Sequence, residues 1–345
     1  MKFDFIIGNP PYQEEAVGDQ KTFTPPPVYH KFMDGAYSVG RKVELITPAR
    51  FLFNAGGAPK EWNERMLSDE HLKVIAYEVD SSKFFVNTDI KGGVAITYRD
   101  ADAKLGPIAV FIPIAELKSI LSRVIHRKDF SPISDIVYSR TAFRLTSALH
   151  EEHPEASKKL SESHLYDMST NIFDLLPEFF HVEKPDNKFE YIRIFGRQNN
   201  ERTYRYIRAD YVNQGCNLYD WKIFVPNSNG SGALGEVLTT PVVGQPVVGH
   251  TETFMSIGKF SAQDEAEAAL KYIKTKFARV LLGILKVTQH NPPTVWKYVP
   301  LQDFTANSDI DWTATIAEID RQLYAKYGLS DEEIAFIERR VKEMA

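Results

Sequence analysis

The tetrapeptide Asn9–Tyr12 (Asn-Pro-Pro-Tyr) combines residue types that could carry out chemistry, and it closely follows the apolar run 3–7. The side-chain carbonyl of Asn9 and the backbone carbonyl of Pro10 are hydrogen-bond acceptors. Pro10 and Pro11 lack an N–H group and have a fixed φ, so the loop is stiff. Acceptors on the two N–H bonds of an aromatic amine localise its nitrogen lone pair, and they help most when already in place. The tetrapeptide therefore indicates activation of an exocyclic amino group.

Tyr12 meets a second requirement of such chemistry on a nucleobase. A base within a duplex is out of reach and must be flipped out, which costs a few kcal/mol. Stacking on an aromatic ring returns roughly 1–3 kcal/mol per base. The alternative interpretation is a Pro-Pro turn beside an unrelated tyrosine, and the strand-like run before the loop favours the chemical interpretation.

Residues 1–100 predict the elements that would position this loop. Short apolar runs alternate with helical stretches, which is typical of an α/β sheet whose active residues follow the carboxyl ends of the strands. We expect strands at 3–7, 43–46, 72–79 and 93–98, and helices at 28–39 and 60–67.

The remainder of the chain has a different pattern. It predicts a helix at 114–127, an irregular stretch with short β-like runs at 137–238, and one long helix at 264–287. Two further helices follow, the last beginning at Ser330, where Glu333 completes a capping-box spacing. We expect a catalytic part at 1–110, a recognition domain at 111–300 and a helical segment at 301–345.

A basic and aromatic stretch at 191–208 is the candidate nucleic-acid surface. It has a net charge of +4 within a chain of net charge −5, and tyrosines alternate with its arginines. Arginine can contact guanine edges or phosphates, and tyrosine adds stacking. The alternative is an exposed hairpin with solvated charges. The candidate DNA-binding residues are Arg193, Arg197, Gln198, Arg202, Arg205 and Arg208, placed about a turn at 196–200; Arg140 and Arg144 are weaker candidates.

The bulk composition excludes several other classes. The acidic net charge argues against nonspecific coating of nucleic acid. The single cysteine excludes an internal disulfide and a thiolate zinc site, and His150 and His153 lack the spacing of a zinc motif. Without an apolar run of membrane-spanning length or a secretory signal, we expect a cytoplasmic protein without membrane partners or bound metal.

The segment FDFIIGNPPY resembles the catalytic motif of amino-group methyltransferases that use S-adenosylmethionine, in which Asn-Pro-Pro-Tyr marks N6-adenine targets. The order of the following segments is similar to TaqI-like and type IIG-like restriction–modification enzymes, and 265–330 resembles members with a fused specificity domain. The resemblance implies roles for Asn9, Pro10, Pro11 and Tyr12 as catalytic residues. It implies Phe85, or alternatively Phe84, as the ring on the other side of the flipped base.

The family places its donor-binding glycine loop before Asn-Pro-Pro-Tyr, whereas only eight residues precede Asn9 here. We therefore expect the S-adenosylmethionine motif to be absent and its binding residues to be unassignable. The literal G-x-G-x-x-G at Gly230–Gly235 lacks a following crossover helix because Pro241 and Pro246 interrupt it, which indicates a loop without a cofactor.

These observations predict an α/β fold, with a partial Rossmann-like methyltransferase sheet, then a mixed α+β target-recognition domain and C-terminal helices. The expected function is methyl transfer from S-adenosylmethionine to adenine N6 in double-stranded DNA, with doubtful activity for this chain alone. The expected partners are DNA and a separate N-terminal methyltransferase half or a restriction subunit. Two alternatives stay open: a DNA-binding specificity subunit without catalysis, and a protein-glutamine or RNA methyltransferase.

Overall fold

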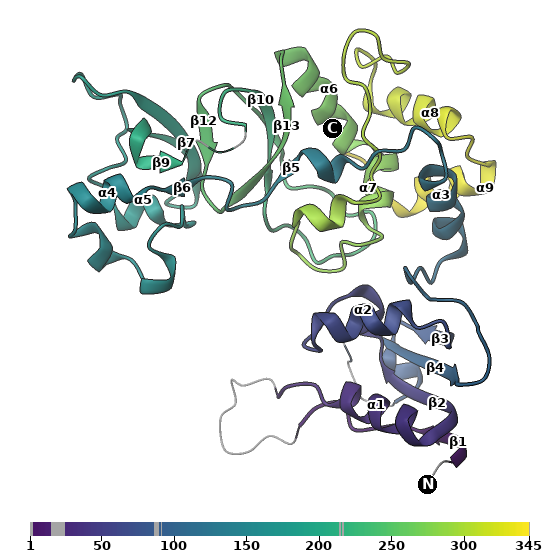
Figure 1. Cartoon of the computed structure of the whole chain (residues 1–345). Helices are drawn as coiled ribbons and strands as arrows, with labels where there is room; N and C mark the ends of the chain where they lie inside the picture. Colours follow the sequence, from purple (N-terminus) through teal and green to yellow (C-terminus); the bar gives the residue numbers. More distant parts are fainter. Residues whose placement is uncertain are drawn as a thin grey trace. The chain divides into compact units, whose positions relative to one another are not determined.

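The computed structural model describes residues 3–14, 25–85, 90, 92–213, 215 and 217–344. The chain divides into two compact units, Met1–Pro113 and Ile114–Ala345 (Figure 1). The C-terminal helices belong to the second unit, together with the helix that begins it. Each unit is described by itself.

The first unit is one four-stranded sheet with helices. Its elements are β1 (Phe3–Gly8), α1 (Tyr29–Val39), β2 (Gly40–Pro48), α2 (Lys60–Ser68), β3 (Leu72–Glu78) and β4 (Val94–Asp100). The strand order is β1-β2-β4-β3. β1 pairs with β2 in parallel, and β4 is antiparallel to both β2 and β3. Because β1, β2 and β3 thus run in one direction, the loops that follow them leave the same edge of the sheet.

The core of the first unit lies under α1, α2 and the centre of the sheet. Met33 of α1, Trp62 of α2 and Leu72 of β3 are buried in one cluster with Phe51. The helices are amphipathic and place these side chains on the sheet, which fixes the strands and so the loops at their ends.

The second unit contains two larger sheets and a group of helices. Its helices are α3 (Ala115–Ile125), α4 (Ser147–Glu152), α5 (Ile172–Leu175), α6 (Gln263–Lys274), α7 (Lys276–Leu282), α8 (Ile316–Lys326) and α9 (Asp331–Arg340). Its strands are β5 (Val137–Tyr138), β6 (Arg144–Leu145), β7 (Tyr191–Gln198), β8 (Glu201–Arg208), β9 (Val212–Asn213), β10 (Trp221–Pro226), β11 (Val242–Gly244), β12 (Val248–His250) and β13 (Phe254–Phe260). The sheets have the orders β11-β10-β13-β5, β12-β7-β8 and β6-β9.

The prediction of one long helix at 264–287 is wrong, because two helices, α6 and α7, are found in this part of the chain. Thr275 adopts an extended backbone, with φ −58° and ψ 151°, and separates α6 from α7. Its hydroxyl accepts a hydrogen bond from Ala278 N at 3.1 Å. A side chain that caps a new first turn stabilises a break in the middle of a helical pattern.

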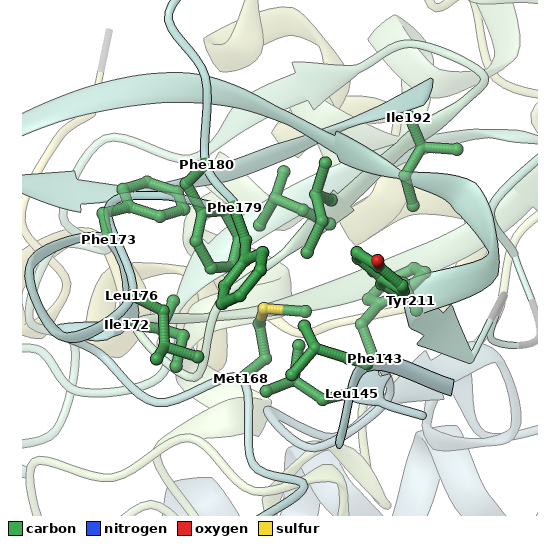
Figure 2. Packing of buried hydrophobic residues seen from close by; sticks show 14 of the residues in the cluster. Phe143, Leu145, Met168, Ile172, Phe173, Leu176, Phe179, Phe180, Ile192 and Tyr211 are labelled. Atoms are coloured by element: carbon green, nitrogen blue, oxygen red, sulfur yellow. The ribbon is translucent and has the colours of Figure 1, made fainter. Parts of the chain in front are cut away.

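A large apolar cluster supports the β7–β8 hairpin (Figure 2). Ile192, Ile194 and Ile207 of the hairpin are buried in it, against Phe143, Phe173 and other side chains. Alternation along a strand sends the neighbouring side chains, including Arg193, to the opposite face. One face of the hairpin packs on this cluster, and on the other face Phe195 is buried against Phe224 and Phe254.

Candidate functional site

The Asn-Pro-Pro-Tyr loop begins where β1 ends. Asn9 and Pro11 are exposed, and Pro10 and Tyr12 are half-buried. The Tyr12 carbonyl accepts a hydrogen bond from Val28 N at 3.0 Å, and Glu14 N donates to Pro26 O at 3.0 Å. These bonds tie the loop to the residues just before α1, so the stiffness from the two prolines is reinforced at its far end.

The fold brings Tyr12 and Phe85 together, although 72 positions separate them in the chain. Their ring centroids are 6.3 Å apart, with the planes inclined at 75°. Phe85 follows β3, and its N–H donates to Ser81 O at 2.9 Å. Phe84 is 41% exposed, and the structure records no ring contact between it and Tyr12 among the described residues.

The edge-to-face arrangement limits what could enter between the two rings. A base stacked on both would need about 7 Å between parallel ring planes, because each face-to-face contact takes about 3.5 Å. The rings are 6.3 Å apart and inclined. One ring must therefore turn before a base can lie between them.

Tyr12 is held as a neutral phenol. Burial raises its pKa to about 12. Its hydroxyl lies 3.5 Å from the carbonyl oxygen of Ile46 in β2, which is a weak hydrogen bond at that length. The ring, rather than the hydroxyl, is the group that this geometry presents.

Arg50 is a residue at the same sheet edge that sequence reasoning missed. It follows β2 in a short 3-10 helix, Ala49–Phe53. It is exposed, and within the described part of the chain it forms no ion pair. A Cβ on Gly92 would lie 2.6 Å from Arg50 Cγ, and Gly92 has φ +86°. A glycine there permits the close approach, and the only sequence signal was an arginine four positions after the strand expected at 43–46.

The candidate DNA-binding residues lie in the β7–β8 hairpin, where pairs face each other across the strands. Arg197 pairs with Arg202, and Phe195 pairs with Tyr204. The guanidinium of Arg193 lies 5.4 Å from the ring centroid of Tyr204. Arg193, Arg197 and Arg202 share the face opposite Ile192 and Ile194, and none of them forms an ion pair within the described ranges.

Arg202 and Arg197 carry neighbouring positive charges, and neither pairs with a carboxylate within the part of the chain that the structure describes. The pKa of Arg202 is lowered, first by burial and then by the charge of Arg197. The Arg202 guanidinium donates to the carbonyl oxygens of Thr240 and Thr239 at 2.6 and 3.2 Å. Two neighbouring arginines that form no ion pair among the described residues are suited to an anionic ligand.

Arg205 and Gln198 lie on the other face of the hairpin. Arg205 Nη2 donates to Gln198 Oε1 at 2.5 Å, and Gln198 Nε2 donates to Asp174 Oδ1 at 2.9 Å. Asp174, Arg197 and Gln198 line a hollow of about 620 Å³ at the hairpin tip.

Arg208 differs from the hairpin arginines described above because its guanidinium is paired with carboxylates of the protein. Its side chain is 12% exposed and forms ion pairs with Glu152 at 2.7 Å and Asp210 at 2.5 Å. Those hydrogen bonds raise its pKa despite partial burial. The weaker candidates are also paired, Arg140 with Glu252 at 3.2 Å and Arg144 with Asp167 at 2.9 Å.

The glycine loop at Gly230–Gly235 binds a carboxylate of this chain. The N–H groups of Ser231 and Gly232 donate to Glu236 at 2.8 and 3.0 Å. Lys286 neutralises Glu236 in a short ion pair. Because an internal anion already occupies these donors, the loop does not fit the methyl donor.

Among the described residues, no three or more His, Cys, Asp or Glu side chains gather in a way that could hold a metal ion. Nor does any described helix combine the length and apolar character that a membrane crossing requires.

Comparison with known proteins identifies the family that the first part of the chain resembles. Residues 1–85 match the family model of the Eco57I restriction-modification methylase. A curated protein of Mycoplasma pneumoniae, described as an uncharacterized adenine-specific methylase, is 30% identical over 95 residues. That match covers 27% of this chain and 22% of that protein, so the chain spans about a fifth of the relative.

Two solved structures resemble the chain over most of its length. The type IIG restriction endonuclease BpuSI matches with a TM-score of 0.37 and 10% identity, over 93% of this chain and 49% of that one. The type IIL restriction-modification enzyme MmeI, solved in complex with DNA, matches with a TM-score of 0.40 and 11% identity, over 98% and 56%.

Proposed function

We propose that this chain holds and activates adenine in site-specific N6 methylation of DNA, and that its second unit recognises the DNA. The match of residues 1–85 to a restriction-modification methylase supports a DNA methyltransferase role. The observation that carries the proposal is the contact between Tyr12 and Phe85 beside the Asn9–Pro11 loop, at the edge where β1, β2 and β3 end.

In this proposal the loop acts on the amino group of a flipped adenine. The Asn9 side-chain oxygen and the Pro10 carbonyl oxygen accept hydrogen bonds from its two N–H groups, which localises the nitrogen lone pair. The ring of Tyr12 stacks on one face of the base, and Phe85 turns to cover the other, with Phe84 as the alternative. Arg50, at the same edge, is placed to contact a flanking phosphate.

S-adenosylmethionine is the methyl donor that the family implies, and it would supply an electrophilic methyl group. We assign no residue of this chain to its binding, because the glycine loop with the appropriate spacing holds Glu236 instead. A separate donor-binding part would explain the exposed face of β1, where Phe3, Phe5 and Ile7 are 52%, 69% and 79% exposed. Parallel strands are normally covered on both faces.

The second unit supports DNA recognition through the β7–β8 hairpin, which carries Arg193, Arg197 and Arg202 and, at its tip, Gln198. A two-stranded β-ribbon fits the major groove, and arginines that form no ion pair with any described residue are available to phosphates or base edges. Arg208 is left out because Glu152 and Asp210 bind it. The same observation favours the second candidate function, a recognition subunit that binds DNA without catalysis.

The test measures transfer of labelled methyl groups from S-adenosylmethionine to duplex DNA, RNA and a glutamine-containing peptide. The full chain is used in cell extract, where a donor-binding partner can be present, and after purification. We expect the label to be recovered as N6-methyladenine in DNA and to be lost with Asn9→Ala. Label in RNA or peptide would contradict the proposal. A third outcome is sequence-specific DNA binding that Asn9→Ala does not change, with no methyl transfer in either preparation. That outcome would contradict catalysis and favour a recognition subunit.

A further inference from the structure

The amide of Gln198 has an orientation that its two neighbours determine. Arg205 donates to Oε1 at 2.5 Å, and Asp174 accepts from Nε2 at 2.9 Å. A guanidinium has only donors and an ionised carboxylate only acceptors, so the oxygen must face Arg205 and the nitrogen must face Asp174. The usual ambiguity between amide oxygen and nitrogen is thereby removed.

The backbone also fixes where this amide lies. Asn199 and Asn200 both have positive φ, 51° and 65°, which is the conformation of a two-residue type I′ turn. Gln198 pairs with Glu201 directly before this turn. The side chain is half-buried and lines the hollow of about 620 Å³ at the hairpin tip.

Among the described residues, the internal contacts of Gln198 use half of its hydrogen-bonding capacity. An amide oxygen accepts two hydrogen bonds and an NH2 group donates two. After Arg205 and Asp174 are satisfied, one acceptor position and one N–H remain. An acceptor and a donor on one glutamine amide match the N6–H and N7 of adenine in the major groove.

We propose that Gln198 reads an adenine in the DNA recognition sequence, and that Arg205 and Asp174 are positioning residues that fix its amide. Oε1 accepts from adenine N6 and Nε2 donates to N7. This inference rests on the proposed DNA recognition by the second unit. It adds a base identity and assigns the reading to one side chain.

Arg197 provides the contrast at the same tip. It is exposed, lines the same hollow and forms no ion pair within the described part of the chain. A cation that contacts phosphate contributes affinity without sequence information. Its removal should weaken binding to all duplexes about equally, whereas changes at Gln198 should act at one base pair.

The experiment selects bound duplexes from a randomised DNA library with the full chain and sequences them. The wild type is expected to select a motif with adenine at one position that Gln198 controls. Gln198→Glu should shift this position toward cytosine, because a carboxylate only accepts and cytosine N4 only donates. Gln198→Ala and Asp174→Ala should each lower the preference for adenine there by about tenfold to a hundredfold.

Arg197→Ala is the matched control and should keep the wild-type motif with lower affinity at every site. Thermal melting of each variant separates recognition from stability. An unchanged motif for Gln198→Glu and Gln198→Ala, with wild-type binding intact, would overturn the inference and leave the proposed function standing. A wild-type chain that selects no motif would overturn both.

Discussion

At the scale of single residues, Tyr12 is expected to act through its ring. Tyr12→Ala should lower methyl transfer to DNA about tenfold to a hundredfold, the equivalent of roughly 1–3 kcal/mol of base stacking. Tyr12→Phe should retain most of the activity, because the hydroxyl makes only a 3.5 Å contact with Ile46 O. The measurement is the initial rate of label transfer, with thermal melting as the control for folding.

The pH profile distinguishes the ring from the hydroxyl. Burial raises the pKa of Tyr12 to about 12, so the phenol stays protonated from pH 7 to 10. Wild type and Tyr12→Phe should therefore share one profile over this range. A loss with Tyr12→Phe as large as with Tyr12→Ala would show that the hydroxyl takes part.

At the scale of elements, the sequence predicted the strands and helices of the first unit to within a few residues. Strands expected at 43–46 and 72–79 are found at Gly40–Pro48 and Leu72–Glu78. The chemistry of the loop was readable because it depends on adjacent residues. The ring contact between Tyr12 and Phe85, and the hydrogen bond from Gln198 to Asp174, join residues that are distant in the sequence. Local periodicity does not encode such contacts.

The break between α6 and α7 was not predictable for the same reason. Apolar residues keep helical spacing across Thr275, and no glycine or proline marks the site. The first N–H groups of α7 are satisfied from outside the segment. Asp320 of α8 accepts from Lys276 N at 3.0 Å and from Phe277 N at 2.9 Å. A distant carboxylate thus stabilises a helix start that the local pattern hides.

The Thr275 cap gives a stability prediction at this scale. Thr275→Ala should lower the free energy of unfolding by about 1 kcal/mol, since the Ala278 N–H loses its acceptor. Thr275→Ser retains the hydroxyl and should lose less. Chemical denaturation of both variants measures the difference. Equal losses would mean that the methyl group, rather than the hydrogen bond, supports the break.

At the scale of the whole molecule, His250 should make stability depend on pH. It is fully buried, and burial lowers its pKa to about 4, with Lys222 nearby adding a smaller effect. The unfolded chain takes up the proton near pH 6.5, before the folded one does, so stability is present above 6.5 and is lost as the pH falls toward 4. Between pH 7 and 5 the loss attributable to His250 should be about 2 kcal/mol.

Denaturant unfolding at pH 7 and pH 5 checks this expectation. His250→Gln removes the titrating group and should flatten this part of the pH dependence, whatever its effect on stability at pH 7. The carboxylates of the chain titrate equally in both proteins, so the comparison isolates the imidazole. The same slope in wild type and variant would contradict a buried neutral His250.

The exposed side chains of β1 should make the isolated chain bind apolar probes. Phe5 and Ile7 are 69% and 79% exposed on one face of an edge strand. Contiguous exposed apolar groups mark interaction surfaces. The double variant Phe5→Thr, Ile7→Thr keeps β propensity and should reduce the fluorescence of a hydrophobic dye, with stability changed by no more than about 0.5 kcal/mol.

Val182, 71% exposed, supplies the control, since Val182→Thr should leave dye binding unchanged. Equal dye binding by wild type and the double variant would show that β1 is not an apolar docking face, and would remove the structural support for a donor-binding part that packs there.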